Sequence, residues 1–188
     1  MANQSSTAFG FRPLRKVGQN DNNAGLSEWK KATGTAAINH HELTQLTADG
    51  VVLSSTTGTN NNIGSLNGSF YTAPTTLKPT WSNYAPNVVA SDQVCLVNDD
   101  PQQMFEAMTS LTNYTAVSVG GCCPIVVGSG SGSPNYISGN SLGAVGTDDQ
   151  IKILGLTRDT ASQDFSVAGS VWRVMVNQNM LGNNIAGI

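Results

Sequence analysis

The adjacent histidines His40 and His41 are the side chains of this sequence best suited to acid–base chemistry or metal binding. A nucleophilic triad places a histidine beside a nucleophile and an orienting acid, and neither ring has a recognisable partner of this kind. Adjacent side chains of an extended segment point to opposite sides, so the two rings would not share one metal ion. We therefore expect two polar surface or loop residues here, with no catalytic or metal-binding role.

Two pairs of acidic residues, Asp99-Asp100 and Asp148-Asp149, lie at the ends of expected strands. A glycosidase needs two carboxylates on facing walls of a cleft, and a calcium loop needs acidic residues at alternate positions before a glycine. Neither pair has such a spacing. Asp is favoured in turns because its side chain bonds to the nearby backbone, so we interpret both pairs as turn residues.

The glycine-rich stretch VVGSGSGSP (126–134) does not match a nucleotide-binding loop. A dinucleotide fingerprint would need glycine at position 133 and a helix after it, whereas the chain has Ser133 followed by Pro134. A phosphate-binding P-loop would need a lysine, and none is nearby. We expect a flexible Gly/Ser loop.

The three cysteines, Cys95, Cys122 and Cys123, form no C-x-x-C pattern, so the signatures of zinc and redox sites are missing. Neighbouring cysteines rarely bond to each other, because the ring would be strained. Buried thiols in a reducing cytoplasm are the expectation. Taken with the preceding motifs, the sequence predicts no enzyme, no metal site and no cofactor.

The composition favours a β-rich protein. Only 11% of the residues are charged, against about 25% in ordinary soluble domains, and hydroxyl and amide side chains take their place. The hydrophobic content of 39% is enough for a core. Such a composition is typical of proteins with many turns and of surfaces that neighbouring molecules cover.

Alternating apolar side chains between turn residues predict strands along most of the chain. The expected strands are 26–34, 36–38, 51–54, 94–97, 151–159 and 170–180. Leu26 and Trp29 are candidate core residues of the first strand. The segment 101–111 fits either a helix or a strand, and 56–70 is expected to be a long surface loop. We predict a mainly β fold, with residues 26–188 forming one antiparallel β-barrel or sandwich.

Residues 1–25 are predicted to form an extended N-terminal arm, because Pro13 and the lack of periodicity leave its apolar side chains without a local core. Residues 1–31 carry five basic and two acidic side chains. The arm residues expected to bind a partner are Phe9, Phe11, Arg12, Leu14, Arg15 and Lys16. Too few basic residues gather there for a nucleic-acid partner, and no apolar run is long enough to span a membrane.

Four segments of the chain occur in the same order in a family of tailed-phage structural proteins. They are AFGFRPLRKVG, VVASDQVCLVNDDPQQMFEAM, SGNSLG and IKILGLTRDTASQDFSVAGSVWRVMVNQNML. Over residues 8–181 the chain resembles the capsid decoration, or cement, proteins of short-tailed marine phages. The resemblance implies a β-rich protein that is made in the host cytoplasm and binds in many copies to the outer capsid surface of the virion.

The implied partners are the major capsid protein, whose subunit contacts the protein would stabilise, and other copies of the chain in a dimer or trimer. Two alternatives stay open. One is a tail-tube or head–tail connector protein, which would share the β-rich composition. The other is a carbohydrate-binding β-sandwich, in which Trp81, Tyr84 and Tyr136 would form a surface for sugar stacking.

Overall fold

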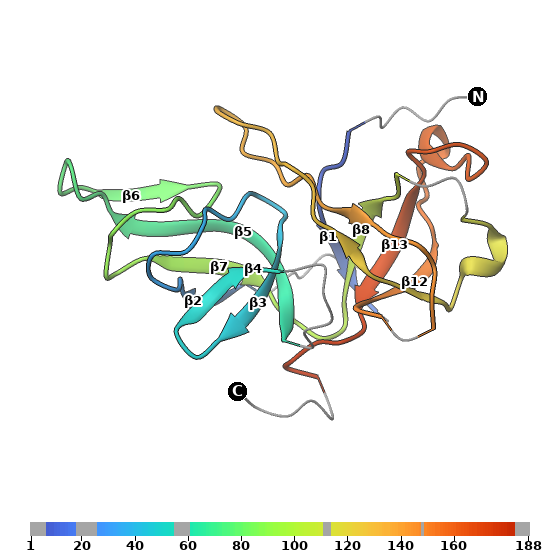
Figure 1. Cartoon of the computed structure of the whole chain (residues 1–188), viewed down its shortest axis with the longest axis horizontal. Coiled ribbons are helices and arrows are strands. Elements are labelled where there is room, and N and C mark those ends of the chain that lie inside the picture. The colour runs from blue at the N-terminus through green and yellow to red at the C-terminus, as the bar shows by residue number, and fades with distance from the viewer. Residues whose placement is uncertain (1–6, 18–25, 55–60, 111–113, 148, 183–188) are drawn as a thin grey trace.

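The computed structural model describes residues 7–17, 26–54, 61–110, 114–147 and 149–182. These residues form two antiparallel sheets that lie side by side along the long axis of the molecule (Figure 1). Two short 3-10 helices, η1 (Ala116–Ser118) and η2 (Thr160–Ser162), are the only helical elements within these ranges. The predicted mainly β, antiparallel fold is confirmed, and the described strands form no closed barrel.

The first sheet has the strand order β1-β8-β13-β12-β9. Its strands are β1 (Arg12–Lys16), β8 (Gln103–Met108), β13 (Val171–Val176), β12 (Ile151–Leu156) and β9 (Cys122–Cys123). A small two-stranded ribbon, β10 (Ile125–Val126) and β11 (Ser141–Leu142), lies beside it. The segment 101–111, which fitted a helix or a strand, contains strand β8.

The second sheet has the order β2-β7-β5-β3-β4, with β6 paired to the far end of β5. Its strands are β2 (Ser27–Lys30), β3 (Leu43–Thr47), β4 (Gly50–Leu53), β5 (Asn62–Thr72), β6 (Pro79–Ser82) and β7 (Val94–Asn98). A single parallel bridge between Lys31 and Val51 brings β4 close to the end of β2. All six strands lie between β1 and β8 in the sequence, so the whole second sheet separates β1 from the strand with which it pairs.

The core of the first sheet follows from strict alternation along β13. Trp172, Val174 and Val176 point inward and are buried, while Arg173 and Met175 point to the other face. The rings of Trp172 and Tyr114 pack edge to face with their centroids 5.3 Å apart, and Trp172 Nε1 donates to Ser170 Oγ. The expected strand at 170–180 contains β13, which is a central strand paired with β12 and β8.

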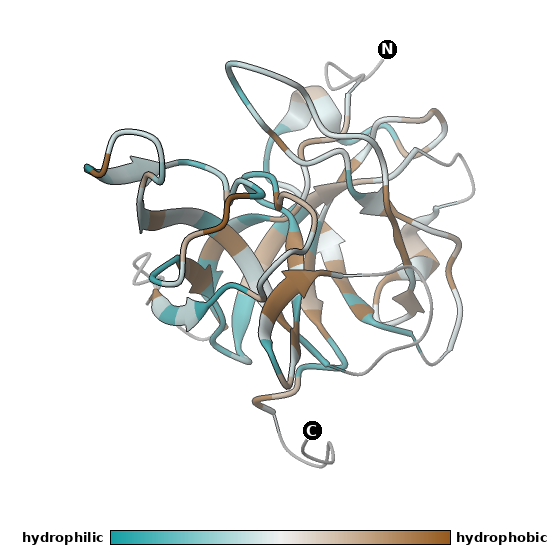
Figure 2. Cartoon of the chain, turned by 60° about the vertical axis from the view of Figure 1, so that its left-hand side comes forward, coloured by the Kyte–Doolittle hydropathy of each residue, from teal (hydrophilic) through white to brown (hydrophobic). Residues whose placement is uncertain are grey.

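The second sheet has a core of its own, built from Ile38, Val51, Ile63, Leu66, Ala85, Cys95 and Val97. Figure 2 shows the hydrophobic residues concentrated on the strands, whereas the loops are mostly pale or teal. Trp29 packs partly against this core, but Leu26 is 42% exposed. The expectation that Leu26 is a core residue is therefore wrong, because the strand begins only at Ser27.

Three expectations for the second sheet need correction. The segment expected to be a long loop, 56–70, contains most of β5, the longest strand of the described residues. Residues 39–50, for which no strand was expected, contain β3, which pairs with β4 across the turn at Ala48 and Asp49. In place of a strand at 36–38 there is a single bridge from Ile38 to Ala85.

The expectation of an extended N-terminal arm also needs correction, because the middle part of that segment belongs to the fold. Residues 12–16 form β1, the edge strand of the first sheet. Phe11 is fully buried and meets Phe105 edge to face at 6.4 Å. Its N–H donates to His41 O, and its carbonyl accepts from Ser65 Oγ. Phe11 therefore joins the two sheets from inside, and the expectation that it anchors an external partner is wrong.

Candidate functional site

A row of charged side chains crosses the outer face of the first sheet. Arg12 on β1 lies opposite Glu106 on β8, and Glu106 lies opposite Arg173 on β13. Since Phe105, Val174 and Trp172 point to the core, alternation places these three side chains on the opposite face. Neighbouring strands are about 4.8 Å apart, so the two arginines flank Glu106 across roughly 10 Å.

Glu106 is nearly buried, and its charge is compensated on both oxygens. Oε2 accepts a hydrogen bond and ion pair from the Arg12 guanidinium, and Oε1 accepts from Thr157 Oγ1 at 2.6 Å. A buried carboxylate needs such partners to remain ionised at low cost. Glu106 thus uses its charge within the chain and holds Arg12 in place.

Arg173 is positioned by backbone rather than by an acid. Its Nε donates to Leu156 O at 2.9 Å. A Cβ at Gly155, the residue opposite, would lie 3.0 Å from Arg173 Nη2, so the glycine leaves room for the guanidinium. A carbonyl does not neutralise the charge, and Arg173 retains its positive charge at the surface.

Two hollows lie on either side of Glu106. The first has a volume of about 290 Å³ and is lined by Pro13, Leu14, Arg15, Met104, Glu106, Arg158 and Arg173. The second, of about 280 Å³, is lined by Phe9, Arg12, Glu106, Thr157, Asp159, Ser162 and Val171. Strand β1 and the segment that follows β12 therefore supply most of the walls.

All four arginines of the chain line these two hollows. Only two acidic residues, Glu106 and Asp159, accompany them. Within the described ranges, Arg15 and Arg158 have no ion-pair partner. The rest of the chain is acidic on balance, since the net charge is −3. The site is thus a local concentration of guanidinium groups on an otherwise acidic protein, and it can bind anions.

The residues predicted for the arm divide into three groups in the structure. Leu14 and Arg15 line the first hollow. Phe9 and Arg12 line the second, where the guanidinium lies over the Phe9 ring at 5.2 Å. Two are engaged elsewhere: Phe11 in the core, and Lys16 in an ion pair with Asp100.

Sequence reasoning did not select Glu106, Arg158 or Arg173 as site residues. A signal for Arg173 was available, because the alternation along 170–180 places it opposite Trp172 and Val174. That alternation predicts that the Arg173 side chain lies on the outer face of the strand, where most arginines are found. Arg158 and Glu106 carried no such signal, since only the folded sheets bring them to Arg173.

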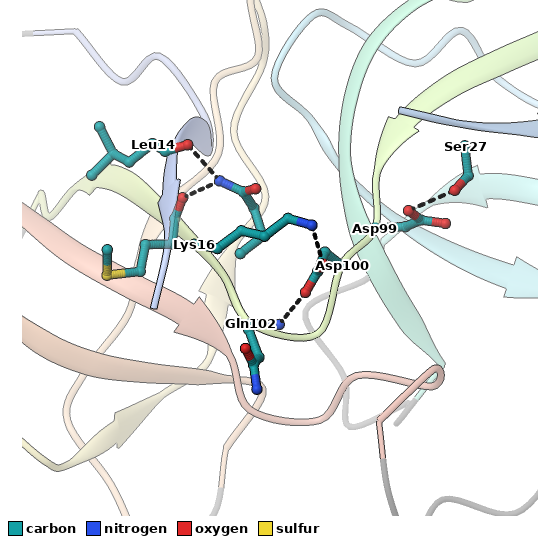
Figure 3. A network of polar contacts seen from close by, with 8 residues as sticks. Leu14, Lys16, Ser27, Asp99, Asp100 and Gln102 are labelled. Carbon is teal, nitrogen blue, oxygen red and sulfur yellow. Dashed lines mark hydrogen bonds and ion pairs between the residues drawn. The ribbon is translucent and has the colours of Figure 1, made fainter. Parts of the chain in front are cut away.

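The two acidic residues Asp99 and Asp100 point in opposite directions at the junction of the sheets (Figure 3). Asp99 accepts from Ser27 Oγ and Trp29 Nε1 of the second sheet. Asp100 pairs with Lys16 of the first sheet and caps the Gln102 N–H. The hydrogen bond from Lys16 lowers the pKa of Asp100. The interpretation of this pair as turn residues is consistent with these contacts, and the pair also links the sheets.

The two histidines do not point to opposite sides, as had been expected. His41 has a positive φ of 62°, so the segment is not extended, and the two rings lie against each other with their centroids 3.8 Å apart and their planes tilted by 32°. Burial, together with the charges of His40 and Arg12, lowers the pKa of His41 to about 4. His40 Nδ1 lies within hydrogen-bonding distance of the carbonyls of Asn67 and Asn83. The pair is part of the junction between the sheets.

The cysteines are buried and unbonded, as expected. Burial raises the pKa of the Cys95 thiol and that of the Cys123 thiol to about 12. A thiol with so high a pKa stays protonated and is a poor nucleophile. No group of three or more His, Cys, Asp or Glu side chains in the described segments could hold a metal ion.

Of the three aromatic residues considered for sugar stacking, the structure brings two together. The rings of Tyr84 and Tyr136 stack on each other 3.8 Å apart, and each covers one face of the other. Trp81 is 54% exposed on the edge strand β6. Tyr136 follows the Gly/Ser segment 126–134, and hydrogen bonds hold the chain there in place: His40 N donates to Tyr136 O, and Ser131 N donates to Ile137 O.

No helix within the described residues is long and apolar enough to cross a membrane. No protein-family model, curated protein or solved structure matched the sequence. The family resemblance of the sequence motifs therefore stays a prediction.

Proposed function

We propose that the protein is a virion structural protein that decorates the outer surface of an icosahedral phage capsid and stabilises contacts between major capsid subunits. The observation that carries the proposal is the gathering of all four arginines around two hollows on the outer face of the first sheet. A surface of this kind fits an acidic protein partner. The motif resemblance of the sequence supplies the identity of that partner.

In this proposal the docking surface is preformed on the first sheet and does not depend on a loose arm. The side chains of Leu14 and Arg15 are held by strand β1, so little conformational entropy is lost when they bind. Because the two hollows are small, each copy would make only a modest contact with the shell. On a shell with many equivalent sites, contacts of one copy with several subunits add through effective concentration.

The experiment is co-sedimentation of the purified protein with capsid shells that lack it. The double variant Arg15→Glu with Arg158→Glu reverses two charges that have no partner in the described part of the chain. We expect its apparent affinity to fall at least about tenfold, because like charges would face the acidic partner. Lys30→Glu with Lys78→Glu makes the same charge change on the second sheet and should bind normally.

Two outcomes would count against the proposal. If neither the wild-type protein nor the control sediments with the shells, the protein does not decorate them. If the Arg15, Arg158 variant binds as well as the control, the arginine face is not the docking surface. Quantifying the copies per purified particle separates decoration from the connector alternative, because a connector is present in far fewer copies.

A further inference from the structure

We propose that the first hollow binds an extended peptide segment that carries acidic and apolar side chains on the same face. In this arrangement Arg15, Arg158 and Arg173 hold a carboxylate, and the apolar neighbour packs on Pro13, Leu14 and Met104. The inference deepens the proposed function and rests on it for the kind of protein that carries the segment.

The choice of a carboxylate follows from the cations present. The site contains guanidinium groups only, and a planar guanidinium matches the two oxygens of a carboxylate with two parallel hydrogen bonds. Arg173 uses its Nε on Leu156 O, which fixes the side chain and leaves the terminal nitrogens as donors. Arg15 and Arg158 approach from β1 and from the residues after β12, so three guanidinium groups border one hollow.

A nucleic acid fits this site less well than an acidic peptide. Glu106 lies at the centre of the row, and Asp159 lines the neighbouring hollow. A phosphate backbone places a charge at every nucleotide and needs a continuous basic track, which these two carboxylates interrupt. A peptide can place its acidic residues over the arginines and an uncharged residue elsewhere.

The apolar part of the segment follows from the rest of the lining. Met104 is 8% exposed, and Pro13 and Leu14 are half-buried on the adjacent strand. Methionine adapts its shape to varied apolar partners. Because side chains two residues apart lie on one face of an extended chain about 7 Å from each other, an acidic residue and an apolar residue at positions i and i+2 can both reach the site.

The test is fluorescence anisotropy with the full-length protein and a labelled synthetic peptide of repeating Glu-Ser-Leu-Ser. Two control peptides carry Gln in place of Glu, or Ser in place of Leu. We expect saturable binding of the first peptide that weakens with added salt, and at least tenfold weaker binding of each control. A labelled single-stranded DNA oligonucleotide serves as the alternative anion.

The variants are Arg158→Gln and, as a matched control, Lys78→Gln, both at exposed positions. Arg158→Gln should weaken binding of the peptide roughly tenfold or more, the usual loss for a hydrogen bond to a charged group, whereas Lys78→Gln should leave it unchanged. Arg173→Gln should have a similar effect, and Arg158→Gln alone decides the matter if the Arg173 variant does not fold.

Each outcome has a definite consequence. Equal binding of the Glu and Gln peptides, equal loss in the two matched variants, or tighter binding of DNA than of the peptide would overturn the inference. Binding of the peptide without binding of shells would leave the inference standing and overturn the proposed function. If the protein binds shells in a way that depends on Arg158 but does not bind the peptide, the proposed function stands and the inference about the peptide is overturned.

Discussion

Replacing Phe11 by alanine tests whether the N-terminal segment is part of the fold. Phe11 is fully buried in the core of the first sheet, contacts Phe105 edge to face, and lies at the junction with the second sheet. Truncation of a buried phenylalanine typically costs about 3–5 kcal/mol. The edge-to-face contact contributes about 0.5–1.5 kcal/mol within that loss, so we expect a value in the upper half of the range.

The measurement is urea unfolding at equilibrium, followed through tryptophan fluorescence. Trp172 is fully buried in the same core and reports its loss. A domain near the middle of the usual stability range, about 10 kcal/mol, would remain folded without denaturant after this loss, so the free energies of the two proteins can be compared directly. The dependence on urea should not change, because the same surface is exposed on unfolding.

Phe9→Ala is the matched control, since Phe9 is half-buried and lies under Arg12 at the surface. We expect a loss of no more than about 1 kcal/mol there, mainly from the contact between the cation and the ring. A loss below about 1 kcal/mol for Phe11→Ala would refute the reasoning. It would mean that the segment is held loosely and that β1 is not a structural strand.

Three further predictions follow from the structure. Trp172→Ala should lower the free energy of unfolding by about 3–5 kcal/mol, against less than about 1 kcal/mol for the exposed Trp81→Ala, both by urea unfolding; equal losses would contradict the assigned core. Because the folded-state pKa of His41 is depressed to about 4 from its usual 6.5, the unfolded chain binds this proton more readily, and stability should fall as the pH is lowered through that window. The loss should reach up to about 3 kcal/mol, and His41→Asn, which tolerates the positive φ, should flatten the curve; an unchanged pH profile would mean that His41 is not buried. Gly139→Ala should destabilise the protein by about 1–3 kcal/mol, because the new Cβ would lie 2.2 Å from Ser129 O. A Cβ at Gly132 meets nothing within 4 Å, so Gly132→Ala should be neutral. Equal effects of the two variants in thermal unfolding would show that residues 129 and 139 are not in close contact.

The strands with a clear hydrophobic period were predictable from the sequence. Residues 171–176 alternate between apolar inward and mixed outward positions, and β13 has that orientation. Strand β7 was predicted at 94–97 from the apolar run VCLV before a cluster of turn residues, and it extends one residue further, to Asn98. In both strands, the order of side chains along the sequence and their burial in the fold indicate the same element.

Strand β5 was missed because most of its buried positions, apart from Ile63 and Leu66, are polar or small. Ser65 is fully buried and donates to Phe11 O. A Cβ at Gly64 would lie 1.9 Å from Asn98 O, so only glycine allows that strand to approach. Such positions are satisfied by hydrogen bonds and close backbone contact, which no hydropathy pattern records.

The misjudged arm has the same kind of cause. Phe11 has no local partner, since its neighbours in space come from β8 and from the chain around His41. The basic residues near it were recognised as candidate binding residues, and Arg12 and Arg15 do line the hollows. Their companions Arg158 and Arg173 come from the other end of the chain, and only the pairing of β1, β8 and β13 brings them together.

The most direct test of the docking surface is an electron cryomicroscopy reconstruction of decorated shells. The account predicts that the first sheet faces the shell, with acidic side chains of a capsid subunit within ion-pair distance, about 4 Å, of Arg15 and Arg158. A reconstruction in which that face points to solvent, while the second sheet contacts the shell, would contradict it.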